Sequence, residues 1–212
     1  MSRILVDFTS VDHPIGALIA PSGLHLLRTV DRRRTPHKEL LSALAERWWP
    51  TTDTFHFGWG EMTMTPEDFS AIFGIPFGVR PLEFYSDWRQ AIPPAQMTDL
   101  PQDYRCVART VLATSGSHIF DGFHAGTVSV HQATRFTVLL LIASTFYVNK
   151  KQAVDLGILK SLEDLSCLEY DWAGAMLCRL YEDMCTLWRG HTKVCSISYC
   201  WEVMIFNSFS FS

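Results

Sequence analysis

The amino-acid sequence predicts a mainly α fold: an irregular helical domain with one short β-hairpin near residues 53–65. Apolar residues recur at helical spacing in several segments, whereas aromatic residues alternate with polar ones in the hairpin region. Hydrophobic residues make up 48% of the 212 residues and charged residues only 19%. So much apolar sequence excludes an intrinsically disordered chain, and a domain of this length needs neither disulfides nor a metal to fold.

Charge and targeting signals narrow the class of protein. The formal net charge is −4 and the isoelectric point is about 6.0, which argues against nucleic-acid binding through a broadly basic face. Asp7 interrupts the first apolar run, so no secretory signal is expected. The longest apolar stretch, residues 136–148, is shorter than the roughly 20 residues that cross a bilayer as a helix. We therefore expect an intracellular protein in which this stretch is a buried core helix.

The N-terminal residues 1–34 are expected to be irregular, with one short helix near Leu24–Val30, because prolines and glycines interrupt them. The next helix is predicted to begin at Thr35 and Pro36, which have the residue types of an N-cap and a first helical position. Its apolar stripe consists of Leu40, Leu44 and Trp48. Pro50 is predicted to end this helix.

The hairpin is predicted because the spacing of apolar residues changes from a helical period to strict alternation. Aromatic residues alternate in residues 54–57, residues 61–65 alternate as well, and glycines lie between the two runs. One face of this hairpin would pack on the helical core through Phe55, Phe57, Met62 and Met64.

A short helix is predicted directly after the hairpin. Thr65 and Asp68 have the spacing of a capping box, in which each side chain binds the backbone N–H of the other residue. Pro66 suits the first helical position, and Met64 and Phe69 occupy the positions of a hydrophobic staple. Gly74, followed by Pro76, is predicted to end this helix after about two turns.

The remaining chain is predicted as further helices separated by loops. Residues 77–101 are expected to be an irregular connection with a helical turn near 85–90, and the glycine-containing stretch around 116–126 is expected to be a loop. A helix over 172–188 would have Asp171 as its N-cap and Gly190 just beyond its end. The other predicted helices cover residues 104–113, 133–148 and 156–165.

Signatures of known catalytic chemistry are absent from the sequence. It contains no glycine-rich phosphate loop, no G-x-S-x-G elbow and no H-E-x-x-H motif, and none of its five lysines has a recognisable cofactor context. His56 and Glu61 form the best acid–base pair, which we interpret as a structural hydrogen bond rather than a catalytic one. No cofactor and no metal are expected.

Two clusters have alternative interpretations. The six cysteines are expected to be reduced and buried, and the alternative is a zinc site, which lacks the usual C-x2-C pair. Its ligands would be Cys185, His191, Cys195 and Cys200. The basic run Arg32–Arg33–Arg34 is interpreted as a solvated loop, with a nuclear-import or phosphate patch as the alternative.

The stretch from Leu40 to Pro76 resembles the plant mobile domain family, also called aminotransferase-like or maintenance-of-meristems-like. The family pattern contains E-R-W-x-P, then T-F-H and G-E-x-T-x-T, and ends on G-x-P. The matching positions are Leu44, Glu46, Arg47, Trp48, Pro50, Thr54, Phe55, His56, Gly60, Glu61, Thr63, Thr65, Asp68, Gly74 and Pro76.

A second block agrees with this family. Tyr170–Ala175 resembles its Y-x-W-G-x-A turn through Asp171 and Trp172, although alanine stands where glycine is usual. Thr134–Phe136, Phe146–Lys151 and Leu162–Leu165 resemble its second helical section. The resemblance covers residues 35–204, so the expected domains are an irregular segment 1–34, an incomplete plant mobile domain 35–204 and a non-family tail 205–212. The family usually continues beyond this point, so we expect a C-terminally truncated domain.

The resemblance implies a non-enzymatic nuclear interaction module with roles in development, meristem maintenance, transposon silencing and genome stability. It implies a protein partner, either a phosphatase-like protein or a chromatin factor, and no membrane association. The alternatives are a transposon-derived remnant with a nucleic-acid-associated role and an enzyme of transferase type, which no residue supports.

The motif residues have predictable structural roles. Thr63, Thr65, Asp68, Gly74 and Pro76 are turn and cap residues, and Trp48 and Phe55 belong to the core. The polar side chains are interpreted as a buried hydrogen-bond network that joins hairpin and helix, or alternatively as a partner-binding surface. These polar residues are Arg47, His56 and Glu61. From Val194 onward the only charged residue is Glu202, so we also expect an exposed apolar patch there.

Overall fold

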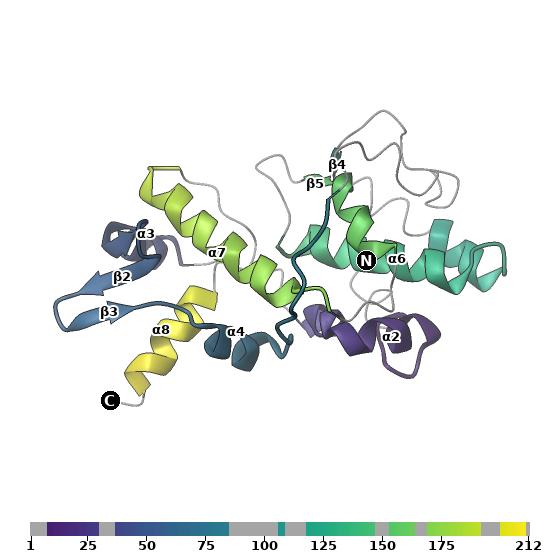
Figure 1. The fold of residues 1–212 in the computed structure, drawn as a ribbon, viewed down its shortest axis with the longest axis horizontal. Coiled ribbons are helices and arrows are strands. Elements are labelled where there is room, and N and C mark those ends of the chain that lie inside the picture. The colour runs from purple at the N-terminus through teal and green to yellow at the C-terminus, as the bar shows by residue number, and fades with distance from the viewer. Residues whose placement is uncertain are drawn as a thin grey trace.

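Helix α7 (Trp172–Trp188) runs through the middle of the molecule, with the other elements grouped on either side of it (Figure 1). The computed structural model describes residues 8–29, 37–84, 106–108, 118–146, 153–163, 169–191 and 200–210. The fold is mainly helical with a small three-stranded antiparallel sheet, which confirms the predicted fold class.

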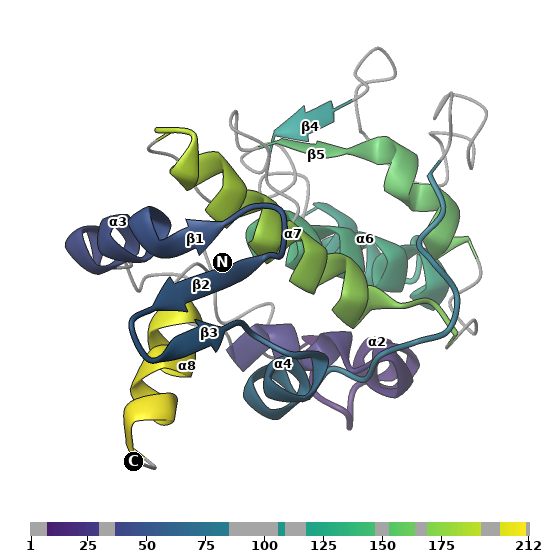
Figure 2. The same ribbon diagram turned by 60° about the vertical axis from the view of Figure 1, so that its left-hand side comes forward.

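The hairpin side of the molecule contains the three-stranded sheet and three helices, and Figure 2 shows its strands side by side with α8 next to the hairpin. Helix α4 continues from this hairpin and packs on α7. The elements of this side are α3 (Lys38–Arg47), β1 (Trp48–Trp49), β2 (Thr54–Phe57), β3 (Gly60–Met62), α4 (Pro66–Phe73) and α8 (Cys200–Ser210).

The other side is built around the apolar helix α6, against which the N-terminal helix α2 packs. Residues 136–146 of this helix and of the turn after it are buried, as predicted for the longest apolar run. The elements of this side are α2 (Pro14–Ile19), η1 (Ala20–Ser22), η2 (Leu24–Thr29), β4 (Cys106–Ala108), α6 (Val130–Ser144), β5 (Ala153–Asp155) and η5 (Leu156–Leu162).

The predicted hairpin is confirmed, but it belongs to a larger sheet than expected. Strand β2 pairs with β3, with Phe55 opposite Met62 and His56 opposite Glu61. Trp48 extends the sheet as strand β1, opposite Phe55, although its spacing from Leu44 predicted a helical position. The backbone leaves the helical conformation and becomes extended at Trp48, because its indole packs edge-on against Phe55, with ring centroids 4.8 Å apart.

The N-terminal third departs from the sequence-based expectation. Helix α2 was not predicted, because its N-cap is His13, whose Nδ1 accepts a hydrogen bond from the Ile15 N–H, rather than one of the usual small polar residues. The segment at residues 24–29 is helical as expected but of the 3-10 type. Thr35 and Pro36 lie outside the described residues. Helix α3 begins at Lys38, with His37 rather than Thr35 at the N-cap position.

Two further predictions in the middle of the chain were wrong, and a third had the right position but the wrong type of helix. Residues 106–108 form strand β4, which pairs with β5, instead of a helix, because strand pairing overrides a weak local preference. Residues 118–124 are helical rather than loop, since Ile119 and Phe120 pack into the core. The helix predicted over 156–165 is present as the 3-10 helix η5, in which Leu156, Leu159 and Leu162 are buried. The helical turn predicted at 85–90 lies outside the described residues.

The C-terminal helix is better covered than the sequence suggested. Cys200 and Trp201 are fully buried, and Met204 and Ile205 are nearly so. The expectation of an exposed apolar patch is therefore wrong for the start of α8, because Phe55 of the hairpin and Tyr181 of α7 pack on Trp201. Phe206 is the exposed large apolar side chain of this helix among its described residues.

Candidate interaction surface

The family motif begins with local turn and cap chemistry, which the structure confirms. The Thr65 hydroxyl accepts a hydrogen bond from the Asp68 N–H at 3.2 Å, and the Thr65 N–H donates to the Asp68 carboxylate at 2.9 Å. Gly74 ends helix α4 in the left-handed region, with φ of 70°. Thr63 donates to the backbone carbonyl of Asp53 at 2.7 Å, which ties the end of the hairpin to its beginning.

The inner face of the sheet attaches the hairpin to the helices through aromatic rings. Trp48 and Phe55 are buried and contact the buried Trp201 of α8, with ring centroids 5.7 and 5.2 Å from it. The indole N–H of Trp48 donates to the sulfur of Cys185 at 3.2 Å. Tyr181 of α7 lies beside Trp48 and donates its hydroxyl to the Met64 carbonyl at 2.5 Å, and burial raises the pKa of this phenol.

The outer face of the sheet presents Trp49, Thr54, His56 and Glu61, one residue out of phase with the inner set. Trp49 stacks on His56 with ring centroids 5.1 Å apart and an interplanar angle of 30°. His56 Nε2 lies 3.7 Å from Glu61 Oε1, and the Thr54 hydroxyl donates to Glu61 Oε2 at 3.2 Å. We refer to these four residues as the outer face.

This arrangement contradicts the buried hydrogen-bond network that the sequence suggested. The Glu61 side chain is 57% exposed and that of His56 39% exposed. Arg47 is also exposed, at the end of α3, and no contact joins it to the His56–Glu61 pair. The alternation of strand residues contained the signal: His56 follows the core residue Phe55, so it must point away from the core.

The other motif residues divide between the surface and the core. Glu46 and Pro76 are exposed and Pro50 is half-buried. Gly60 opens β3 at the exposed turn, with φ of 148°, which favours glycine. Trp172 is buried on α7.

Asp171 joins two parts of the chain that are far apart in sequence. Its carboxylate Oδ1 accepts hydrogen bonds from the Gly174 N–H at 2.8 Å, which caps α7 as predicted, and from the Gly78 N–H at 3.1 Å. The approach of Gly78 is close, since an added Cβ would lie 2.4 Å from the carbonyl oxygen of Glu169. We refer to residues 77–84 as the connecting segment.

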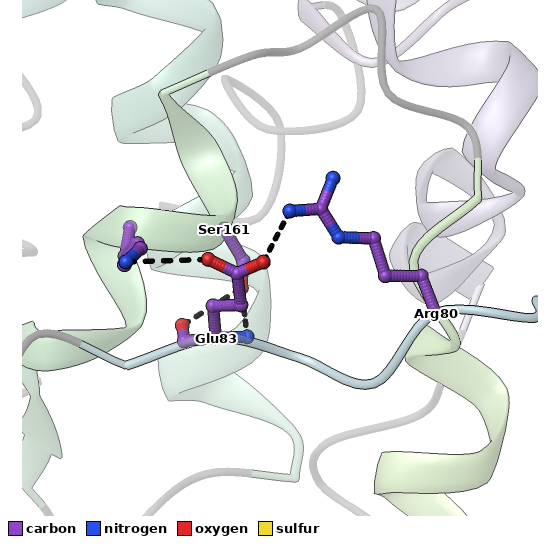
Figure 3. Close-up of polar contacts among 4 residues, drawn as sticks. Arg80, Glu83 and Ser161 are labelled. Atoms are coloured by element: carbon purple, nitrogen blue, oxygen red, sulfur yellow. Dashed lines mark hydrogen bonds and ion pairs between the residues drawn. The ribbon is translucent and has the colours of Figure 1, made fainter.

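The connecting segment continues into a polar junction that sequence analysis did not predict (Figure 3). Glu83 pairs with Arg80, and its second carboxylate oxygen lies 3.3 Å from Lys160 Nζ. The buried hydroxyl of Ser161 accepts from the Glu83 N–H and donates to the Glu83 carbonyl, both at 2.8 Å. The hydrogen bond from Arg80, together with Lys160, holds the pKa of Glu83 below its usual value, although desolvation opposes this shift.

Two segments of the second family block are joined by hydrogen bonds from one side chain to backbone carbonyls. Arg135 of α6 donates to the carbonyl oxygens of Leu162 at 2.9 Å and Glu163 at 2.7 Å, at the end of η5. Two family-like segments, Thr134–Phe136 and Leu162–Leu165, are therefore in contact.

Among the described residues, no group of three or more histidines, cysteines or acidic residues is arranged to hold a metal ion. Cys185 instead contacts Trp48 and the Asp53 carboxylate, at 3.2 and 3.7 Å. Cys200 is buried, which raises the pKa of its thiol, and Cys195 lies outside the described part of the chain. No helix in the described ranges has the length and apolar character needed to cross a membrane.

Comparison with known proteins identifies relatives over most of the chain. Protein MAINTENANCE OF MERISTEMS of Arabidopsis thaliana is 29% identical over 180 residues, which cover 79% of this chain and 36% of that protein. Protein MAIN-LIKE 2 from the same plant is 49% identical over 43 residues, 20% of this chain and 6% of its own length. Serine/threonine-protein phosphatase 7 long form homolog, again of Arabidopsis thaliana, is 29% identical over 158 residues, 69% of this chain and 11% of its own.

The chain therefore spans about a third of the first relative and smaller fractions of the other two. No solved structure matches it significantly. The sequence profile of the plant mobile domain matches residues 23–207, which is most of the chain and includes the hairpin, α4, α6, α7 and most of α8. The protein belongs to the plant mobile domain family.

Proposed function

We propose that this chain is a non-enzymatic nuclear interaction module that binds a protein partner through the outer face of its sheet. One observation carries the proposal: Trp49 is 54% exposed and the Glu61 side chain 57% exposed. Both residues lie within the family-like stretch Leu40–Pro76. Packing accounts for the apolar motif residues, and helix capping accounts for Thr65 and Asp68. Neither accounts for an indole and a carboxylate on an open surface, whereas recognition of a partner does.

The surroundings of the reactive side chains support a role without catalysis. The Ser161 hydroxyl accepts from the Glu83 N–H and donates to the Glu83 carbonyl, so its proton and one of its two lone pairs are already used. A thiol that burial keeps neutral, such as that of Cys200, is a poor nucleophile. The His56–Glu61 pair lies on an exposed face, where water competes with any substrate.

The family and the names of the relatives support the biological setting. The name of the first relative refers to the maintenance of meristems, and another relative is named as a phosphatase homolog. On this basis we propose roles in meristem maintenance, transposon silencing and genome stability, with a phosphatase-like protein or a chromatin factor as partner.

The proposal is tested by recovering partners from plant nuclei with the tagged chain and with the double variant Trp49→Ala/Glu61→Gln. We expect the unmodified chain to enter the nucleus and to recover a phosphatase-like or chromatin protein, and the double variant to lose it. The matched control is Phe84→Ala/Asp12→Asn, which alters an exposed aromatic ring and an exposed carboxylate away from the sheet. Retention of the partner by the double variant, or exclusion of the chain from nuclei, would contradict the proposal.

The transferase alternative has a separate test. Incubation with pyridoxal phosphate is expected to give no Schiff-base absorbance, because no lysine has a recognisable cofactor context. A stoichiometric band that borohydride fixes to one lysine would overturn the non-enzymatic assignment.

A further inference from the structure

The negative charge of the chain is concentrated around the hairpin. Of 18 basic and 22 acidic side chains, residues 46–68 hold one and five, which leaves 17 of each in the rest of the chain. The formal charge of −4 therefore arises entirely within these 23 residues. The carboxylates are exposed, apart from the half-buried Asp53. They belong to Glu46, Asp53, Glu61, Glu67 and Asp68.

This local charge selects the chemistry of a partner. A region with four exposed carboxylates, one half-buried carboxylate and one arginine repels the phosphates of nucleic acids and of anionic membranes, and it attracts basic segments over roughly a Debye length, about 8 Å at physiological salt. Acidic charge alone does not define a site. The outer face adds a second feature that favours one kind of basic side chain.

That feature is the indole of Trp49. One of its faces stacks on His56, yet the side chain remains 54% exposed, so much of the ring system is open to solvent. A planar guanidinium stacks on an open aromatic face better than an ammonium group does, and it also binds carboxylates with two parallel hydrogen bonds. Across the sheet, Trp49 of β1 and Glu61 of β3 lie on opposite sides of His56, so the aromatic plane and the carboxylate occupy one continuous face.

We propose that the outer face binds an arginine-containing basic segment of a partner protein, with one guanidinium on the Trp49 ring and cationic side chains paired with Glu61 and the neighbouring carboxylates. The inference rests on the proposed function and specifies the chemistry of the partner. Glu61 already accepts one hydrogen bond from Thr54 on Oε2, and a carboxylate offers about four acceptor sites, so it retains capacity for an arginine.

The test uses the full chain and a fluorescently labelled peptide in which arginines alternate with glycine and serine. Anisotropy is measured for this peptide and for versions with lysine or glutamine in place of arginine, at low and at physiological salt. We expect the arginine peptide to bind, the lysine peptide to bind more weakly and the glutamine peptide not to bind. Addition of salt is expected to weaken the binding.

Variants of the chain locate the binding site. Trp49→Ala is expected to weaken binding of the arginine peptide about threefold, which corresponds to the loss of an exposed cation–π contact. Glu61→Gln is expected to weaken it by about the same factor, as for an exposed ion pair. Phe84→Ala and Asp12→Asn should leave it unchanged. Thermal melting of each variant shows that it is folded before binding is measured.

Equal binding of the arginine and glutamine peptides would overturn the inference. So would equal losses from Glu61→Gln and Asp12→Asn, since binding would then follow net charge rather than the outer face. The proposed function is judged separately by recovery of partners from nuclei. If Trp49→Ala/Glu61→Gln loses its nuclear partner but no basic peptide binds, the interaction function stands and the basic-segment inference fails. If the double variant keeps its nuclear partner, the proposed function fails whatever the peptides do.

Discussion

The hairpin and the connecting segment are both attached to helix α7, but by different physical means. The hairpin is held by aromatic burial: Trp48 and Phe55 are almost fully removed from water and touch Tyr181 and Trp201. The connecting segment is held by directed polar contacts. Val79 and Arg80 donate backbone hydrogen bonds to the Glu169 carbonyl at 3.0 and 2.9 Å, and further hydrogen bonds and ion pairs join the segment to Asp171, Ser161 and Lys160. Its apolar contacts come from Phe77 and Leu82, which are only partly buried against the core.

This difference has consequences for stability. Apolar burial is non-directional, large and insensitive to pH or salt. Hydrogen bonds and partly exposed ion pairs give less net stability and depend on geometry, protonation and screening. The hairpin is therefore expected to contribute more stability than the connecting segment, which fixes the position of the chain that follows α4.

The strongest test of this comparison is Phe55→Ala. Phe55 is fully buried against Trp48 and Trp201, so its truncation should cost about 3–5 kcal/mol of unfolding free energy, from lost transfer free energy plus a cavity. Trp49→Ala, the adjacent change on the outer face, should cost less than about 0.5 kcal/mol. Urea unfolding followed by circular dichroism measures both. Similar losses for the two variants would show that the two faces are not energetically distinct.

Asp171→Ala tests the polar attachment and should have a smaller effect. The change removes the cap of α7 and leaves the Gly78 N–H without its acceptor, for an expected loss of about 1–2 kcal/mol. Asp171→Asn is the matched control, since asparagine is also a good N-cap and keeps an oxygen acceptor. Equal losses for the alanine and asparagine variants would contradict the hydrogen-bonding role of this side chain.

The same contrast explains what the sequence could predict. The capping box of Thr65 and Asp68, the end of α4 at Gly74 and the cap of α7 at Asp171 depend on residues about three positions apart or on a single left-handed glycine. Such local patterns can be recognised in a single sequence. Core faces were also predictable, because the alternation in β2 places Phe55 and Phe57 on one side.

Contacts between distant segments were not predictable in this way. Glu83 and Ser161 lie 78 positions apart, and nothing in the local sequence of either residue indicates the other. Strand β4 exists because residues 153–155 return beside it, and Trp48 is a strand residue because the hairpin folds back on it. The outer face was misinterpreted for a related reason: alternation shows which side a residue takes, but not whether another element covers that side.

The smallest expected effect is the pH dependence of the polar junction, tested by Glu83→Gln. Because the folded-state pKa of Glu83 lies below its unfolded value, mainly through the hydrogen bond from Arg80, the stabilisation is fully present above the unfolded pKa of about 4.3. It is lost as pH falls through the lowered folded pKa. The stability difference between the unmodified chain and Glu83→Gln should therefore be constant from neutral pH down to about pH 5, then shrink on further acidification. Added salt should shrink it as well, since the charged groups are partly exposed.

Ser161→Ala is the matched neutral control: it breaks two hydrogen bonds at the same junction, and its deficit should not vary with pH over this range. Urea unfolding of the three proteins across this pH range measures the differences. A Glu83→Gln deficit that stayed constant or grew in acid would mean that the ion pairs of Glu83 add no stability and that the junction is held by the hydrogen bonds between Ser161 and the Glu83 backbone.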